Sequence, residues 1–394
     1  MALNISIDTL AEPTLAKTKI NIALAVCLGI VGTALLTGVY AFIVGHQHVY
    51  GVTREVPWGI LISTYAFFAI TSTGLCLLAA LGHSFGGNKL AALGNRAVFL
   101  SIVTILSAFL AIGLELENPH RMLLYNVISP NFSSNIWWMG TLYGLAVGCM
   151  FLEFFAILTR KWQIALAIGI AGALAEVGAN TNLGAVFATL SARPFWYGAQ
   201  LPVYFLCSAF MSGAAAIILF THLSHRMRGA ELDEKTYSGV QMAGKVLALT
   251  LFLLIVATVW RFISLYVGGN ELARLAADNL LTGPLSMNFW VFETVIGLIL
   301  PLFILIGTQM KNVPAMATAS LMALVGAFVQ RFDLVVAGQE TPVFYGWDNL
   351  PKYINYVPSI GEMIIVAGAV ALCVAGFIAG ERLFGRIFSE AGHH

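Results

Sequence analysis

The sequence predicts an all-α polytopic integral membrane protein with about ten transmembrane helices. Of its 394 residues, 59% are hydrophobic and 10% are charged, whereas a soluble domain carries about 25% charged residues. The mean hydropathy is +0.85. A soluble core cannot bury this much apolar surface, so we expect lipid to surround most of the chain. The net charge of +1 gives no electrostatic reason to expect a nucleic-acid partner.

Ten segments have the roughly 20 mainly apolar residues that a membrane-spanning helix needs. They are 20–44, 57–82, 96–116, 137–158, 163–189, 200–221, 244–267, 285–308, 314–338 and 360–380. Apolar runs of this length exclude barrel strands, which cross the bilayer with about 10 residues. The polar residues 1–19 lack the apolar core of a signal peptide and predict a short tail. The basic segment 222–243 is expected to link two halves of four or five helices each.

The distribution of Lys and Arg predicts the orientation, because these residues are enriched in cytoplasmic loops. One side of the predicted topology carries 13 of the 20 basic residues, and both termini lie on that side. The other side carries the remaining seven, which are Arg54, Arg121, Arg193, Arg261, Arg274, Arg331 and Lys352. We therefore expect both termini in the cytoplasm of a bacterium or archaeon, with the protein in its inner membrane.

The predicted periplasmic loops are rich in Asn, Pro, Trp and Tyr. Examples are "NVISPNFSSNIWW" (126–138) and "GQETPVFYGWDNLPKYINYVPS" (338–359). One interpretation is that the aromatic residues only anchor helices at the level of the lipid headgroups. The other is that these loops form a structured docking surface for a water-soluble partner.

The cysteines and histidines argue against a resident redox cofactor. The five cysteines all lie in apolar runs and form no CxxC pair, which disfavours an iron–sulfur or metal site. The eight histidines lie at predicted helix ends, in loops or in the C-terminal tail. A b-type haem needs facing histidines within the membrane, so we expect no intrinsic haem. Nucleotide-binding and hydrolase motifs such as GxxxxGK[ST], HExxH and GxSxG are absent.

Ionisable residues within the predicted helices are functional candidates, because a charge in lipid is costly unless it is paired or hydrated. Nearly all of them lie in the outer half of the bilayer or at its outer edge, except Glu176 near mid-membrane and Glu153 near the inner end. The outer group is Glu115, Glu117, Arg261, Glu293, Arg331, Asp333 and Glu362. This one-sided pattern favours an enzyme or electron-transfer subunit whose protons exchange with a single compartment.

Each of these residues also has a purely structural interpretation. Arg261 and Arg331 could serve only to pair with Glu293 and Asp333. The carboxylates at 115 and 117 could serve only to end a helix. Glu176 is the hardest to explain structurally, because it lies in "LAEVGANTNLGAVF", a segment weakened as a helix by glycine and asparagine.

Several stretches, in their order and spacing, resemble the NrfD/polysulfide reductase family of quinone-reactive membrane subunits. The similarity is greatest to the ten-helix branch that includes the membrane subunit of a nickel-iron hydrogenase. The matching stretches include "VPWGILISTYAFFAITSTG" (56–74), "GLELENPHRM" (113–122), "SPNFSSNIWWMGTLYG" (129–144), "ARPFWYGAQLPVYFLCSAFMSG" (192–213), "MNFWVFETVIGLILP" (287–301), "QRFDLVVAGQ" (330–339) and "YVPSIGEM" (356–363). Together they extend over about residues 50–380.

The resemblance implies a fold and a set of partners. It implies a first four-helix bundle at 57–199 and a second at 200–338. Residues 20–56 would form a peripheral helix and loop, and 339–394 a periplasmic loop, the last helix and a cytoplasmic tail. The chain would hold no haem or iron–sulfur cluster. It would exchange electrons between bound menaquinone or ubiquinone and a ferredoxin-like iron–sulfur subunit docked on the periplasmic face, within a complex that has further catalytic or cytochrome subunits.

The resemblance also assigns site residues. Glu115 takes the acidic position of a family motif in which Pro119 matches the proline, and Arg121 replaces a displaced arginine. Tyr65 stands where the polysulfide reductase subunit has a quinone-contacting histidine, and Asn182 stands roughly where that subunit has a quinone-contacting tyrosine.

Two further roles complete the predicted site. Arg193 and Trp196 match a family turn. We expect Trp196 to donate to a quinone oxygen, as Tyr65 and Asn182 can, and Arg193 would either contact a quinone carbonyl or pair with Glu115. Together with Arg121, these residues make up the predicted quinone site. Because quinol oxidation releases two protons, we expect Glu115, Glu117 and Glu176 to form a proton relay.

Two alternative functions remain open at this point. A secondary transporter or ion-translocating subunit would need a polar path that reaches both faces, and Glu153 and Glu176 are the hints of one. A purely structural anchor would tolerate replacement of Tyr65, Glu115 and Glu176 without loss of activity.

Overall fold

The computed structural model describes residues 17–83, 89–343 and 351–389, and all regular secondary structure within these ranges is helical. Ten of the described helical segments are long and apolar enough to cross a membrane, which confirms the predicted fold class. The spanning helices are α1 (Lys17–Val44), α2 (Ile60–His83), α3 (Ala91–Glu115), α5 (Asn135–Leu158), α6 (Trp162–Ala188), α7 (Gln200–Arg228), α8 (Glu234–Val267), η2 with α10 (Asn288–Gly307), α11 (Val313–Glu340) and α12 (Ile360–Ser389).

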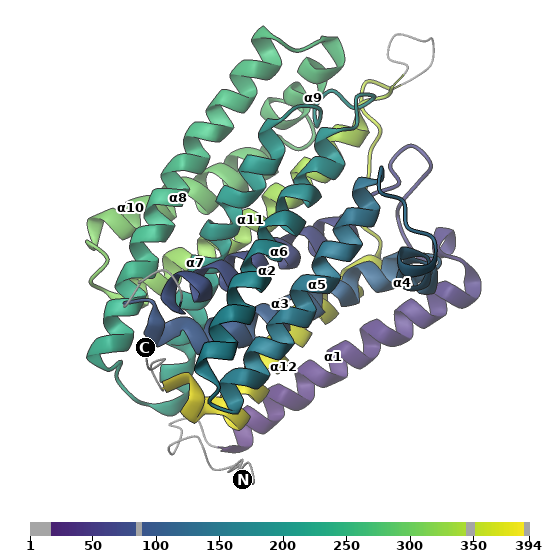
Figure 1. Cartoon of the computed structure of the whole chain (residues 1–394). Coiled ribbons are helices and arrows are strands. Elements are labelled where there is room, and N and C mark those ends of the chain that lie inside the picture. Colours follow the sequence, from purple (N-terminus) through teal and green to yellow (C-terminus); the bar gives the residue numbers. More distant parts are fainter. Residues whose placement is uncertain (1–16, 84–88, 344–350, 390–394) are drawn as a thin grey trace.

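The spanning helices pack as two bundles with a flanking pair (Figure 1). The first bundle contains α2, α3, α5 and α6, in which α2 packs on α3 and α5 on α6. The second contains α7, α8, η2–α10 and α11, and α7 joins the two bundles because it also packs on α2 and α6. Helix α1 packs on α12, which in turn packs on α3. We propose the division at 57–199 and 200–338 as the boundary between the bundles.

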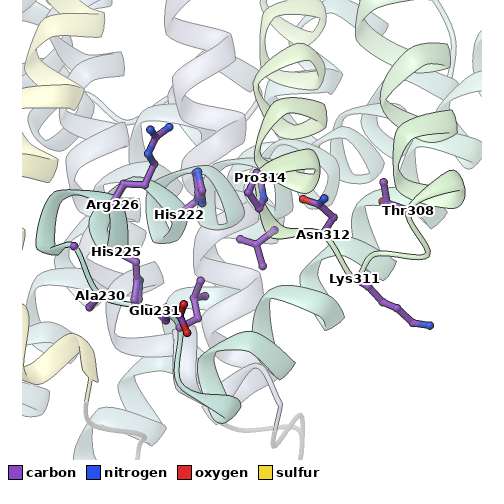
Figure 2. Close-up of a pocket in the computed structure, with 12 residues that line it drawn as sticks. His222, His225, Arg226, Ala230, Glu231, Thr308, Lys311, Asn312 and Pro314 are labelled. Carbon is purple, nitrogen blue, oxygen red and sulfur yellow. The ribbon is translucent and has the colours of Figure 1, made fainter.

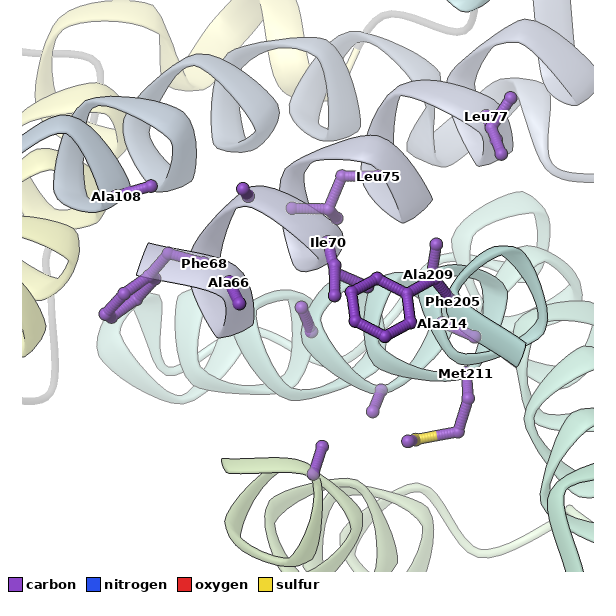
Figure 3. Close-up of a cluster of buried hydrophobic side chains, with 14 of the residues drawn as sticks. Ala66, Phe68, Ile70, Leu75, Leu77, Ala108, Phe205, Ala209, Met211 and Ala214 are labelled. Atoms are coloured by element: carbon purple, nitrogen blue, oxygen red, sulfur yellow. The ribbon is translucent and has the colours of Figure 1, made fainter. Parts of the chain in front are cut away.

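Two glycines allow the bundles to approach closely. A Cβ at Gly74 of α2 would lie 1.8 Å from the carbonyl oxygen of Ala209, and one at Gly213 of α7 would lie 2.3 Å from the carbonyl carbon of Gly74. Apolar side chains such as Leu75 and Phe205 surround this crossing and form part of the main hydrophobic core (Figure 3). The backbones of α2 and α7 can meet here only because neither residue has a side chain.

The loops contain more helix than the sequence predicts. The predicted linker at 222–243 is largely helical, because α7 continues to Arg228 and α8 begins at Glu234. Two short helices, α4 (Pro119–Ile128) and α9 (Glu271–Leu281), and a 3-10 turn, η1 (His46–His48), lie in predicted loops. Figure 1 places α4 and α9 at the end of the molecule opposite to the start of α1 and the end of α12. We call this end, predicted to face the periplasm, the outer end, and the opposite end the inner end.

Candidate functional site

A large open cavity lies at the inner end and contains none of the predicted site residues (Figure 2). It measures about 1000 Å³ and lies between the end of α7 and the turn that leads into α11. His222, His225 and Glu231 line it, while the Lys311 side chain extends away from it in Figure 2. Because this cavity lies at the inner end, it is not the site to which the outer-end carboxylates belong.

A second cavity, of about 410 Å³, lies at the outer end of the first bundle and contains predicted site residues. All four helices of this bundle contribute to it, together with the chain on either side of the α3–α4 junction. Its lining residues are Pro57, Trp58, Ile62, Tyr65, Ala66, Ile112, Glu115, Leu116, Glu117, Met122, Ile136, Met139, Leu183, Val186 and Phe187. The wall is therefore mostly apolar, with one phenol and two carboxyl groups, as in pockets that bind small lipophilic molecules.

The polar groups of this outer cavity come from the ends of two helices. Tyr65 lies in the second turn of α2 and is buried. Glu115 is the last residue of α3 and is half-buried, whereas Glu117 lies beyond the helix end and is exposed. The helix ends at Glu115 because Leu116 adopts an extended conformation and Pro119 then starts α4. The break brings both carboxyl groups to the cavity.

The cavity also opens toward the lipid-facing side of the bundle. Ile136, at the start of α5, lines it and is 55% exposed. Met122 lines it from α4, whose described residues include none that is buried. Neighbouring α4 side chains such as Leu123 and Leu124 are also exposed. This mouth suits a substrate that arrives from the membrane.

A histidine, His46, and a third carboxylate, Glu362, lie beside Glu115; Glu362 was a candidate as an ionisable residue at a helix end, but neither residue was assigned to the quinone site or the proton relay. The buried imidazole of His46 lies near the Glu115 backbone carbonyl and the Glu117 carboxylate, and burial lowers its pKa. Glu362 is held by hydrogen bonds to Oε1 from the Tyr356 hydroxyl at 2.7 Å and to Oε2 from the Gly51 amide at 2.8 Å. Nothing in the residue pattern indicates this grouping, since these residues come from opposite ends of the chain.

Two of the predicted quinone ligands lie next to the cavity rather than in its wall. The Asn182 side chain donates to the Asn135 carbonyl at 2.7 Å. Trp196 is buried behind the wall, where it stacks on Trp58 with 5.6 Å between ring centroids and contacts the edge of Phe187 at 5.3 Å. The indole nitrogen of Trp196 donates to the Leu334 carbonyl at 2.7 Å. Trp196 therefore supports two aromatic side chains of the wall.

The two predicted arginines are separate from the cavity in this structure. Arg193 donates to the carbonyls of Gln339 at 3.2 Å and Thr341 at 3.0 Å, and so holds its turn on the end of α11. Its expected pairing with Glu115 is not formed. Arg121 lies exposed on α4.

Glu176 is fully buried deeper in the same bundle and does not line the cavity. The Thr73 hydroxyl donates to its Oε2 at 2.5 Å, and no described residue hydrogen-bonds to its Oε1. Tyr143 is buried beside Tyr65, with 6.3 Å between the ring centroids, and no described residue hydrogen-bonds to its hydroxyl. Buried polar groups thus extend from the cavity wall at Tyr65 to Glu176 at mid-membrane.

The inner half of this bundle carries another buried ionisable pair. Glu153 of α5 lies 3.8 Å from His83 at the inner end of α2, and both side chains are buried. Cys76 is buried on α2, between Thr73, which hydrogen-bonds to Glu176, and His83 along the helix.

The second bundle buries its own polar cluster. Here Arg331 and Asp333 have neutral hydrogen-bond partners in place of the ion pairs that the sequence suggested. Arg331 donates to Gln330 and Ser208, and Asp333 accepts from Asn288 at 3.1 Å. Glu293 is buried in η2, a π-helical segment over Asn288–Ile299. π-Helical turns are rare and often occur at functional sites. In the described part of the chain, no three His, Cys, Asp or Glu side chains are grouped as a metal site would require.

Comparison with known proteins identifies the family. The family model for polysulphide reductase, NrfD, matches residues 48–343. The Hdr-like menaquinol oxidoreductase integral membrane subunit of Archaeoglobus fulgidus is 25% identical over 387 residues, which cover 94% of each chain. A selenate reductase subunit of Mesobacillus selenatarsenatis is 22% identical over 371 residues, or 83% of this chain and 85% of the relative.

A third relative is similarly matched. The protein NrfD homolog of Haemophilus influenzae is 26% identical over 321 residues, or 73% of this chain and 96% of the relative. With the family model matched over most of the chain and ten membrane-spanning helices in the described structure, this protein belongs to the NrfD/polysulphide reductase family.

Proposed function

We propose that this chain is the membrane anchor and quinone-reactive subunit of a multi-subunit respiratory oxidoreductase, with quinol or quinone bound in the outer cavity. The observation that carries the proposal is the combination of Tyr65, Glu115 and Glu117 in a mostly apolar cavity of about 410 Å³ whose wall includes the exposed Ile136. The relative from Archaeoglobus is named as a subunit of a menaquinol oxidoreductase, which supports menaquinol as the substrate.

The chemistry of the cavity fits the ring of a quinone. The Tyr65 hydroxyl can donate a hydrogen bond to a quinone oxygen, and the flat face of Trp58 can pack against the ring. Quinol oxidation releases two electrons and two protons. Glu115 can accept a proton from a quinol hydroxyl and pass it to water through the exposed Glu117. Glu176 is the second proton acceptor in our proposal, reached through Tyr143 and Thr73.

The electrons need an acceptor outside this chain. We propose that a periplasmic iron–sulfur subunit of ferredoxin type docks at the outer end, and that further catalytic or cytochrome subunits complete the complex. The cavity lies at this end, so a docked cluster would be separated from the quinone only by the loops above it. In this proposal both termini are cytoplasmic and the protein lies in the inner membrane.

Quinol oxidation by the purified complex with an artificial electron acceptor tests the site. We expect Glu115→Gln to lower kcat/KM about 100-fold, because it removes a general base. Glu271→Gln is the matched control, since Glu271 is an exposed carboxylate at the outer end that does not line the cavity. If Glu115→Gln oxidised quinol at the wild-type rate, Glu115 would not be the proton acceptor.

The inner pair of Glu153 and His83 favours a second candidate, an ion-translocating subunit. Together with Glu176 and Cys76 it extends the buried polar groups from mid-membrane toward the inner end. In proteoliposomes, an ion-translocating subunit would take up protons from the inner side in a manner abolished by Glu153→Gln, while the rate of quinol oxidation without a membrane potential would be unchanged.

A further inference from the structure

Arg261 lies at the depth of the outer lipid headgroups. It is separated from Lys245 on α8 by 15 residues without a charge, so the two basic residues are about 24 Å apart along the helix. That distance is slightly less than the thickness of the hydrocarbon layer, which is roughly 30 Å. The long side chains of Lys245 and Arg261 can make up the difference by extending toward the headgroups on either side. The exposed aromatic residues Trp260 and Tyr266 flank Arg261, as is typical of the membrane interface.

The guanidinium of Arg261 has little protein to neutralise it. It lies over the ring of Phe195 at 4.3 Å and makes one long hydrogen bond, of 3.5 Å, to the Phe195 carbonyl. Among the described residues, no carboxylate is within the 4.0 Å of an ion pair with Arg261, although the charge of Glu293 reaches it through space. Most of its five N–H donors are therefore available to a ligand.

Arg261 lines a cavity of about 630 Å³ that is distinct from the proposed quinone cavity. The cavity lies between the turn at 194–199, the start of α7 and the outer end of α8. Gln200 and Ser264 line it, and the Gln200 amide donates to the Ser264 hydroxyl at 3.3 Å. Helix α7 begins at Gln200 without an acidic residue in its first turn and without a side-chain cap. The backbone N–H groups of Gln200 and Leu201 and the positive end of the helix thus add to the charge of Arg261.

We propose that this cavity binds the phosphate of a phospholipid from the outer leaflet. The apolar surface beside it supports a lipid rather than a soluble phosphate as the source, because Val203, Trp260 and Val267 are all strongly exposed on the adjoining faces of α7 and α8. Acyl chains can cover these side chains while Arg261 and the α7 N-terminus hold the phosphate. The bound lipid would join the two bundles at the turn that carries Trp196.

Native mass spectrometry of the delipidated full-length chain in detergent tests this proposal, with phosphatidylglycerol as the probe. We expect the wild-type chain to retain one phosphatidylglycerol molecule. Arg261→Gln should bind this lipid about tenfold more weakly, because its charge-assisted hydrogen bonds are removed. Arg261→Lys keeps the charge and should retain most of the binding, which separates a lost ligand contact from a folding defect. Arg274→Gln is the matched control, because Arg274 is exposed on α9 and does not line the cavity.

Two further probes distinguish the source of the phosphate. Diacylglycerol has the acyl chains without phosphate and should not be retained, and glycerol 3-phosphate has phosphate without the chains and should not displace the lipid. Equal retention of phosphatidylglycerol by wild type and Arg261→Gln would overturn the site. Displacement by millimolar glycerol 3-phosphate would overturn the assignment to a lipid.

Discussion

At the residue scale, Tyr65 and Glu115 lie in the same cavity, although nothing in the sequence around either residue marks them as a pair. Tyr65 is one of many aromatic residues in the chain, and Glu115 is, with Glu117, one of two carboxylates near the end of the third spanning helix. Their joint presence in one apolar cavity depends on the packing of α2 against α3, which the residues alone do not reveal. The family resemblance alone pointed to Tyr65, whereas Glu115 was also a candidate because an ionisable residue in a membrane-spanning helix is costly.

Tyr65→Phe tests the proposed hydrogen bond to the quinone. The phenyl ring fills the same space, so the variant should fold normally and lose only the hydroxyl. We expect KM for quinol to rise about tenfold, the equivalent of one hydrogen bond of about 1.4 kcal/mol. An unchanged KM together with a lowered kcat would instead assign the hydroxyl to proton transfer.

The stability of the folded protein should depend on pH through the protonation of His46. Its pKa in the folded protein is lowered by burial from the ordinary value of 6.5, against the opposing influence of Glu117. The neutral imidazole therefore favours the folded state above pH 6.5, and this contribution is lost as the pH falls through the lower folded-state pKa. Thermal unfolding should show a larger drop in Tm between pH 7.5 and 5 for wild type than for His46→Gln. Equal drops would mean that His46 is not the group responsible.

Arg193 shows what residue patterns leave undetermined. The sequence allowed it either a quinone oxygen or Glu115 as partner. In the structure its guanidinium instead satisfies backbone carbonyls at the end of α11, about 145 residues away in the chain. Carbonyl partners carry no sequence signature, so this role could not have been predicted. We propose that Arg193 positions the turn that places Trp196 behind the cavity wall.

At the scale of the elements, apolar length predicted the spanning helices well and the loops poorly. All ten segments were identified because a lipid-facing helix needs an unbroken apolar run. The short helices α4 and α9 were missed, although each begins with a recognisable signal, Pro119 at the first helical position and Asn270 as a capping residue. The π-helical segment at Asn288–Ile299 could not be predicted, since its apolar residues are as continuous as those of an α-helix.

The close contact between α2 and α7 can be tested by substitution of Gly74. Gly74→Val would place side-chain atoms in the backbone of α7, because even a Cβ would lie 1.8 Å from the Ala209 carbonyl oxygen. We expect the two bundles to separate and the yield of folded, detergent-stable protein to fall at least about tenfold. Gly144→Val on α5 is the matched control, since a Cβ there meets nothing within 4 Å. Comparable yields on size-exclusion chromatography would contradict the tight crossing.

At the scale of the whole molecule, the two bundles differ in what they bury. The first has the outer cavity, with its carboxyl groups and the polar groups that continue inward from it. The second has a compact cluster around Arg331 and Glu293, and the cavity at its outer end, beside Arg261, has no carboxyl group in its wall. We therefore expect quinone chemistry in the first bundle. The sequence predicted carboxylates at the outer side of both bundles and could not separate these two roles.

The end of the molecule at which a partner subunit binds can also be tested. If the iron–sulfur subunit docks at the outer end, chemical cross-linking of the intact complex should join it to Lys352, the one lysine on the predicted periplasmic side. Lysines at the inner end, such as Lys161 and Lys235, should form no cross-link to that subunit. Cross-links through the inner lysines would place the partner on the opposite face and reverse the proposed orientation.

The central claim, that quinone binds in the outer cavity of the first bundle, is tested most directly by photoaffinity labelling of the purified complex with an azidoquinone. Peptide mass spectrometry should find the label within 57–66, 112–122, 136–139 or 183–187, the segments that line this cavity, and excess unlabelled menaquinone should remove it. Labelling confined to α8, η2 or α11, with these four segments unmodified, would contradict the account.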